Sequence, residues 1–294
     1  PADEAAVKGE YEGIVLETRT FAPVPSPGRD APRTPPHLLV LPAFGWSTAA
    51  YGPYLLPLRE TAALTWVRLP TVQDLTGRSG YGDDIPVYPV DRLVRALDAF
   101  RASLKIDRFV VLGIGASGWI AMRYAVLHPD RCAGLVLVDT ALDKEAYGLA
   151  LRRGAARGTP GERFTAKTLL HENNVPFNEG TLHRLQALGL ERAYRDRGDL
   201  EIAWLFHRAR EPQGFATVPD IAWSRHRRVD APALFLYSAA SAFSGHGDAD
   251  RIQRHFPRSL VAPLNEAGGL PYVETNEEFH RVVRHFLERF DLAE

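Results

Sequence analysis

Cysteine is almost absent from this sequence, and it also lacks a membrane-spanning run and the pattern of a signal peptide. The single cysteine, Cys132, excludes an internal disulfide, and its apolar neighbours up to Val138 predict a buried thiol of the core. No apolar run reaches the length of a membrane span, and the residues from Pro1 to Glu4 have neither the basic nor the apolar part of a signal peptide. We therefore expect a cytoplasmic protein with no membrane partner.

Net charge is also lacking. The chain has 35 basic and 36 acidic residues, so its formal charge of −1 gives no long-range attraction to nucleic acid. Its ten histidines form no His-x-x-x-His pattern and no cysteine-containing pattern of a zinc site. We expect no metal and no cofactor, and a small molecule is the simplest ligand to propose.

Short apolar runs alternate with amphipathic stretches, which is typical of a mostly parallel sheet flanked by crossover helices. Leu93, Leu97 and Phe100 recur at helical spacing, as do apolar residues from Phe279 to Phe290. The latter helix opens with the capping box Thr275-Asn-Glu-Glu278. The runs that predict strands are Gly13–Glu17, Leu38–Leu41, Leu64–Leu69, Phe109–Leu112, Leu135–Val138, Ala233–Tyr237 and Leu260–Ala262.

The strand pattern disappears between residues 143 and 219, where the sequence becomes helical and rich in arginine. We expect one α/β core made of residues 1–142 and 220–294, with residues 143–219 inserted as a helical lid over the ligand. The arginine-rich stretches are expected to be solvated helix faces.

One stretch carries the main functional information. Residues 109–118, Phe-Val-Val-Leu-Gly-Ile-Gly-Ala-Ser-Gly, predict a buried strand, a tight turn and the start of a helix. This resembles the nucleophile elbow of the α/β-hydrolase superfamily, where a G-x-S-x-G pattern presents a reactive serine on a strained turn. Here the nucleophile position is Gly115. Ser117 lies two residues later, and its side chain should point away because successive helical residues are rotated by about 100°.

The resemblance extends from about Gly13 to Leu292, and it implies an α/β-hydrolase fold. Leu38-Leu-Val-Leu-Pro-Ala-Phe-Gly45 is similar to the oxyanion strand and loop of the family, and His128-Pro-Asp-Arg-Cys-Ala-Gly-Leu-Val-Leu-Val-Asp139 is a phrase common in it. The family order of nucleophile, acid and histidine places the acid at Ser241 and the histidine at Gly269. All three catalytic positions therefore hold residues unable to form the triad.

A backbone oxyanion hole survives such losses, because N–H groups do not depend on the side chain. The resemblance places these donors at Phe44 and Ala116. Asp139 ends a strand at the edge where α/β sheets bind ligands, and there it is expected to cap a helix or, less readily, to act as acid or base. The expected substrate-binding residues are Ala43, Phe44, Trp46, Gly115, Ser117, Asp139, Ser241, Phe243, Gly269 and Leu270.

The sequence leaves three functions open. The first is a non-hydrolytic epimerase or isomerase, because the triad-less chain resembles the bottromycin epimerase group. That resemblance implies a modified-peptide substrate, with a residue next to a thiazole and a substrate carboxylate acting as the base. The second is a pseudoenzyme that binds a small molecule or protein without chemistry, and the third is a hydrolase whose catalytic residues have moved.

Overall fold

The computed structural model describes residues 4–24, 35–42, 48–69, 90–115, 117–142, 228–238, 249–265 and 271–290. The expected lid at residues 143–219 lies outside these ranges, and so do the boundaries proposed for it. The fold and the site are therefore built from the parts of the chain that the structure describes.

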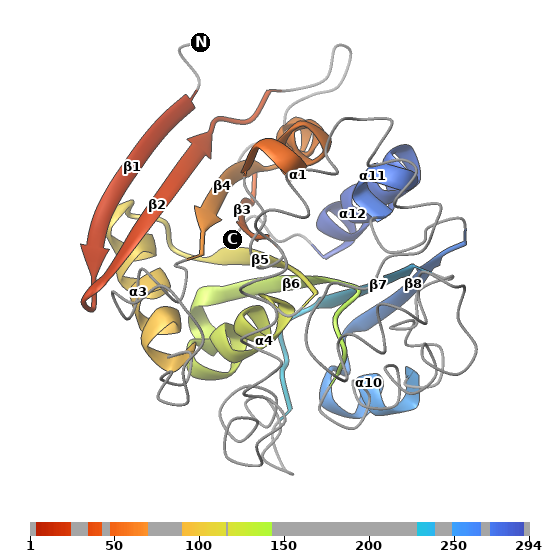
Figure 1. The fold of residues 1–294 in the computed structure, drawn as a ribbon. Coiled ribbons are helices and arrows are strands. Elements are labelled where there is room, and N and C mark those ends of the chain that lie inside the picture. Colours follow the sequence, from red (N-terminus) through yellow and green to blue (C-terminus); the bar gives the residue numbers. More distant parts are fainter. Residues whose placement is uncertain are drawn as a thin grey trace, which may run out of the picture.

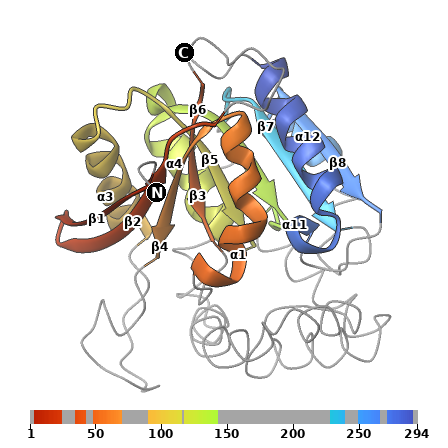
Figure 2. The ribbon, with the colours of Figure 1, turned by 90° about the horizontal axis from the view of Figure 1, so that it is seen from above.

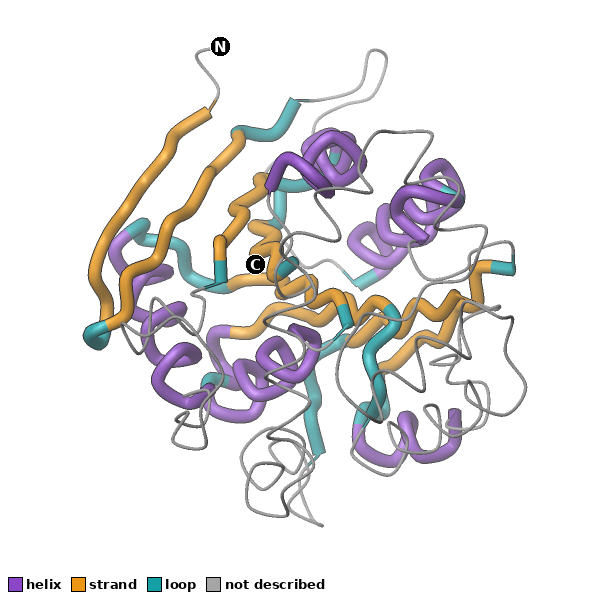
Figure 3. Tube along the Cα trace, in the orientation of Figure 1, coloured by secondary structure: helices purple, strands orange, loops and turns teal. Residues whose placement is uncertain are grey.

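An eight-stranded sheet forms the centre of the molecule (Figures 1 and 3). Its order is β1-β2-β4-β3-β5-β6-β7-β8, with β1, β2 and β4 paired antiparallel and all remaining pairs parallel. This confirms the mostly parallel sheet that the apolar runs predicted. The strands are β1 (Glu4–Tyr11), β2 (Ile14–Phe21), β3 (His37–Leu41), β4 (Ala63–Arg68), β5 (Phe109–Ile114), β6 (Cys132–Val138), β7 (Ala233–Ser238) and β8 (Ser259–Leu264).

Helices cover both faces of the sheet (Figures 1 and 2). On one face lie α3 (Val90–Ser103), α4 (Ser117–Leu127) and α10 (Ala249–His255), and on the other lie α1 (Thr48–Leu55), α11 (Pro271–Glu274) and α12 (Asn276–Arg289). Two short 3-10 helices, η1 (Leu56–Glu60) and η2 (Pro129–Arg131), complete the described elements. This is the three-layer arrangement expected when crossover helices connect parallel strands.

Two apolar clusters, one on each face, hold the layers together. Leu93, Leu97 and Phe100 of α3 are fully buried in the first, and Phe279 and Phe286 of α12 are fully buried in the second. All residues of β5, β6 and β7 are buried, because helices cover these central strands on both sides. The sequence therefore placed the core-facing sides of both helices correctly.

The predicted capping box is wrong in its detail. Thr275 precedes α12, but its hydroxyl makes no capping hydrogen bond to that helix. It donates instead to the carbonyl oxygen of Pro271, 3.1 Å away, at the start of α11. The preceding short helix thus competes successfully for the hydroxyl that the pattern assigned to α12.

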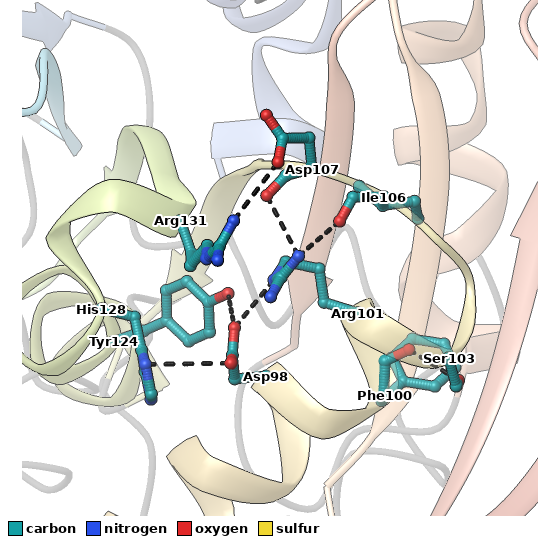
Figure 4. A network of polar contacts seen from close by, with 9 residues as sticks. All are labelled: Asp98, Phe100, Arg101, Ser103, Ile106, Asp107, Tyr124, His128 and Arg131. Atoms are coloured by element: carbon teal, nitrogen blue, oxygen red, sulfur yellow. Dashed lines mark hydrogen bonds and ion pairs between the residues drawn. The ribbon is translucent and has the colours of Figure 1, made fainter.

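A polar network joins α3 and α4 beside the amino ends of the strands (Figure 4). Arg101 is buried, and its Nε donates to Oδ1 of Asp98 at 2.7 Å. Its Nη1 donates to the carbonyl oxygens of Ile106 and Asp107, just before β5. The hydroxyl of Tyr124 donates to the same Asp98 oxygen at 3.0 Å. This network fixes the end of α3 against α4 and the start of the central strand.

Candidate functional site

The turn between β5 and α4 forms the centre of the site. Gly115 follows the last residue of β5 and has a φ of +59°, a left-handed conformation that glycine adopts with little strain. Its N–H donates to the carbonyl oxygen of Val138 at 2.8 Å, and its own carbonyl accepts from Thr140 Oγ1 at 2.9 Å. The turn is therefore fixed to the end of β6 on both sides of Asp139.

Three glycines at this turn differ in the space available for a side chain. A Cβ on Gly113 would lie 2.5 Å from the Cα of Gly118, and a Cβ on Gly118 would lie 2.0 Å from Thr140 Oγ1. These two positions need glycine because backbone and side chains approach so closely. A Cβ on Gly115 meets no atom of the described chain within 4 Å. At that position only the backbone conformation favours glycine, and the space beside it is open.

Ser117 has a structural role that the sequence did not predict. It is fully buried, and its hydroxyl lies 2.8 Å from the carbonyl oxygens of both Leu41 and Ile114. The same oxygen accepts the N–H of Ile114 at 2.9 Å. When Gly113 is the first position of the G-x-S-x-G pattern, Ser117 stands at the fifth position, where the pattern has its second glycine. The expected substrate contact at Ser117 is corrected accordingly: its hydroxyl joins the ends of β3 and β5 and has no exposed surface for a ligand.

Asp139 is the most unusual polar residue of the site. It follows β6 with a φ of +47°, and its carboxylate accepts two hydrogen bonds from Ser238 at the end of β7. The Ser238 N–H donates at 2.7 Å to Oδ1, and the Ser238 hydroxyl donates at 2.6 Å to Oδ2. Asp139 therefore bridges two parallel strands, where the sequence favoured a helix cap. The residue as a whole is half-buried.

Burial, more than neighbouring charge, sets the protonation of Asp139. Burial, and to a smaller extent the negative charge of Glu274, raise the pKa of Asp139 to about 6 against the opposing effect of the two Ser238 hydrogen bonds. On α11, Tyr272 is fully buried, and its pKa is raised by burial and then by the charges of Asp139, Tyr51 and Glu274. No described cation forms an ion pair with Asp139. The carboxyl is thus half protonated at about pH 6.

Sequence reasoning missed Ser238 as the partner of Asp139. The available signal was its position, because it ends a buried strand adjacent to β6, and carboxyl ends of parallel strands meet at one edge. The structure does bring Gly115, Asp139 and Ser238 together at that edge. The other expected site residues lie outside the described residues, and they are Ala43, Phe44, Trp46, Ala116, Ser241, Phe243, Gly269 and Leu270.

Two further kinds of feature are absent from the described residues. These residues contain no cluster of three His, Cys, Asp or Glu side chains arranged to hold a metal ion. None of their helices combines the length and the apolar character needed to cross a membrane.

Comparisons with known proteins agree with this architecture. A family model described as the alpha/beta hydrolase fold matches residues 41–274. The chain is similar to a thermophilic esterase structure from Thermogutta terrifontis, with a TM-score of 0.65 and 19% identity, over 97% of this chain and 99% of that one.

The matches to curated relatives cover a smaller part of each chain. The chain is 23% identical to a 1-acylglycerol-3-phosphate O-acyltransferase of Rattus norvegicus and 24% identical to a (lyso)-N-acylphosphatidylethanolamine lipase of Bos taurus. Each match covers 68% of this chain, but it spans only 63% and 65% of the length of those proteins. With most of its length matched by the family model, the chain belongs to the α/β-hydrolase fold family.

Proposed function

We propose that this protein is a non-hydrolytic enzyme of the α/β-hydrolase fold, an epimerase or isomerase acting on a modified-peptide natural product. The observation that carries the proposal is Gly115. It occupies the strand-to-helix turn where the family presents its nucleophile, and it has open space in place of a reactive side chain.

Acyl transfer needs a nucleophile with a base within hydrogen-bond distance. Ser117 cannot supply it, because its hydroxyl is buried among the three backbone groups of β3 and β5. The curated relatives are named as an acyltransferase and a lipase, and transfer of either activity to this chain would require a nucleophile that Gly115 does not provide. We propose instead a reaction in which backbone N–H groups stabilise negative charge without covalent attack.

Proton transfer at an activated carbon is such a reaction. When the proton leaves, negative charge develops on a neighbouring carbonyl oxygen or ring nitrogen, and backbone N–H groups stabilise it. We propose Phe44 and Ala116 as these donors, with Ala43, Trp46, Phe243 and Leu270 around the substrate and Ser241 and Gly269 leaving room for it. The proposed substrate has a residue next to a thiazole, a carboxylate of its own acts as the base, and the reaction takes place in the cytoplasm without a cofactor.

A pseudoenzyme that binds a small molecule or a protein is the second candidate. The hydroxyl of Ser117 is hydrogen-bonded to Leu41 and Ile114, and that of Thr140 to Gly115 and Val138. The turn therefore has no free hydroxyl, which favours the pseudoenzyme. A hydrolase with relocated residues is the weakest candidate.

Mass spectrometry in D₂O separates these functions. The probe is a synthetic peptide in which an aspartate residue is bonded directly to a thiazole. We expect the protein to introduce one deuteron at the carbon next to the thiazole, with inversion and no other change in composition. Tight binding without exchange would support the pseudoenzyme instead.

Nitrophenyl acetate tests the hydrolase candidate. We expect turnover no faster than the buffer blank, and a Gly115→Ser variant should remain inactive because Ser241 and Gly269 provide no acid and no histidine. A wild-type rate that disappears in Ser117→Ala would restore the hydrolase candidate and contradict the proposed function.

A further inference from the structure

We propose that Asp139 is the group of this protein that returns a proton to the substrate carbon, and that Ser238 positions it for this step. The inference rests on the proposed function and deepens it, because the substrate carboxylate then performs only half of the proton transfer.

Position is the first argument. The N–H of Gly115 donates a hydrogen bond to Val138, and its carbonyl accepts one from Thr140. These two hydrogen bonds hold Asp139 next to the turn at Gly115, which we call the open turn. The backbone N–H of Asp139 donates to Leu236 of β7 at 2.9 Å. Because β5, β6 and β7 are neighbours in a parallel arrangement, their ends place the open turn, the carboxyl and Ser238 at one edge.

Orientation is the second argument. Ser238 donates to both carboxylate oxygens of Asp139, which removes the rotational freedom of that group. A carboxyl has about four lone-pair positions, so two short bonds leave it able to exchange a proton. The residue also has a positive φ, a strain that structures tend to retain at functional sites. The carboxyl is held firmly, in a residue that is half-buried as a whole.

The charges facing Asp139 favour its acid form. Glu274 on α11 raises the pKa of Asp139, and Ser238 on β7 opposes it only with neutral hydrogen-bond donors. Asp139 in turn raises the pKa of Tyr272 on α11, as does Tyr51 on α1. These surroundings, with burial as the largest cause, raise the pKa of Asp139 to about 6. A general acid works best when its pKa lies near the operating pH. The structure thus supplies an acid where the proposed reaction needs one.

The proposed step removes one proton from the substrate carbon and returns one to it. The substrate carboxylate removes the proton from the carbon next to the thiazole, and the C–H electron pair spreads onto the ring. The Asp139 carboxylic acid then gives its proton to the opposite face of that carbon, and the electron pair forms the new C–H bond. Water carries the proton from the substrate carboxylic acid back to Asp139, so the composition of the substrate does not change.

This step predicts a bell-shaped pH profile. The rate should fall above about pH 6, because Asp139 loses the proton that it must donate. It should also fall at acidic pH, because the substrate carboxylate becomes protonated, with an ordinary aspartate pKa of about 3.9. In Ser238→Ala, loss of the hydroxyl bond that stabilises the carboxylate should move the basic limb to higher pH.

The decisive variant is Asp139→Asn, tested with the aspartyl-thiazole peptide in D₂O. Asparagine keeps the size and an acceptor for the Ser238 N–H, so the variant should fold, which circular dichroism checks. Inversion should fall by about 10²- to 10⁴-fold, the usual contribution of general acid catalysis. Exchange without inversion should continue, because the substrate carboxylate can return a deuteron to the face it came from. The matched control is Asp130→Asn, an exposed change on η2 that should leave both rates unchanged.

The outcomes are distinguishable. If the wild-type protein neither exchanges nor inverts the peptide, both the proposed function and the role of Asp139 are overturned. If the wild type inverts it and Asp139→Asn inverts it equally fast, only the role of Asp139 is overturned. An unshifted basic limb in Ser238→Ala also contradicts the assignment, because another group would then set the pH dependence.

Discussion

Two carboxylates at opposite ends of the central strands differ in the sign of their pKa shift. Burial alone would raise the pKa of Asp98, but the hydrogen bonds from Arg101 and Tyr124 and the charge of Arg101 outweigh it and lower the pKa. Burial raises the pKa of Asp139 to about 6, and only neutral donors of Ser238 oppose it. The presence or absence of a buried cation decides the difference.

The two carboxylates also differ in how their charge affects the stability of the fold. Asp98 stays charged and gains stability from its partners at the amino edge, as drawn in Figure 4, with His128 Nδ1 also 3.9 Å from it. Asp139 keeps a charge at neutral pH only at a cost in free energy. A buried group that remains unfavourable in its charged form is a candidate for function, since perturbed pKa values gather at functional sites.

The largest expected effect is at the amino edge. Arg101→Met should reduce the free energy of unfolding by about 3–5 kcal/mol, because it leaves Asp98 partly buried without its cation. Urea denaturation measures this loss. The matched control is Arg131→Met, because Arg131 pairs with Asp107 at the surface, and its loss should cost under about 1 kcal/mol. Equal losses in the two variants would contradict the distinction between a buried and an exposed pair.

The next effect compares the two carboxylates directly through pH. Asp139→Asn should gain stability relative to the wild type as pH rises from 4 to 8, reaching about 1–3 kcal/mol, since one pKa unit corresponds to about 1.4 kcal/mol. The folded pKa of about 6 lies above the ordinary aspartate value of 3.8, so wild-type stability is lost as pH rises through 6.

Asp98→Asn should show the opposite slope. The folded pKa of Asp98 lies below 3.8, so its contribution is present above that pH and is lost on acidification. Thermal unfolding of both variants between pH 3 and 8 measures the two slopes. Parallel slopes would mean that the two environments do not differ as the structure implies.

Much of the fold was predictable because the central strands are short apolar runs buried on both faces. β3, β5, β6 and β7 all coincide with runs identified in the sequence, and the turn at Gly115 followed from the elbow pattern. β1 was not predicted separately, because its residues are largely exposed and carry no such run.

The site was predictable only in part. A pattern names residues, but the partner of a polar side chain depends on which strands become neighbours. Ser238 lies 99 residues after Asp139, and only the pairing of β6 with β7 brings them together. Ser117 was misassigned for the same reason, since its acceptor Leu41 belongs to a strand 76 residues away.

Ser117 should prove structural when it is replaced. Ser117→Ala removes a hydroxyl that bonds Leu41 and Ile114, and it leaves buried backbone groups with fewer partners. We expect a loss of about 1–3 kcal/mol in the free energy of unfolding, the usual cost of an unsatisfied buried group. Inversion of the aspartyl-thiazole peptide should be unchanged at temperatures where the variant stays folded. A lower rate without lower stability would show that Ser117 touches the substrate.

The smallest effect on stability, at the centre of the site, is expected for Gly115→Ala. The new methyl group meets no described atom within 4 Å, so only the positive φ opposes it, which costs about 1 kcal/mol. Gly118→Ala is the contrasting control, because its Cβ would lie 2.0 Å from Thr140 Oγ1 and force the turn apart. If the space beside Gly115 receives the substrate, Gly115→Ala should weaken binding of the aspartyl-thiazole peptide in isothermal titration far more than it weakens the fold. Unchanged affinity in a folded Gly115→Ala protein would place the substrate elsewhere and remove the main support for the proposed function.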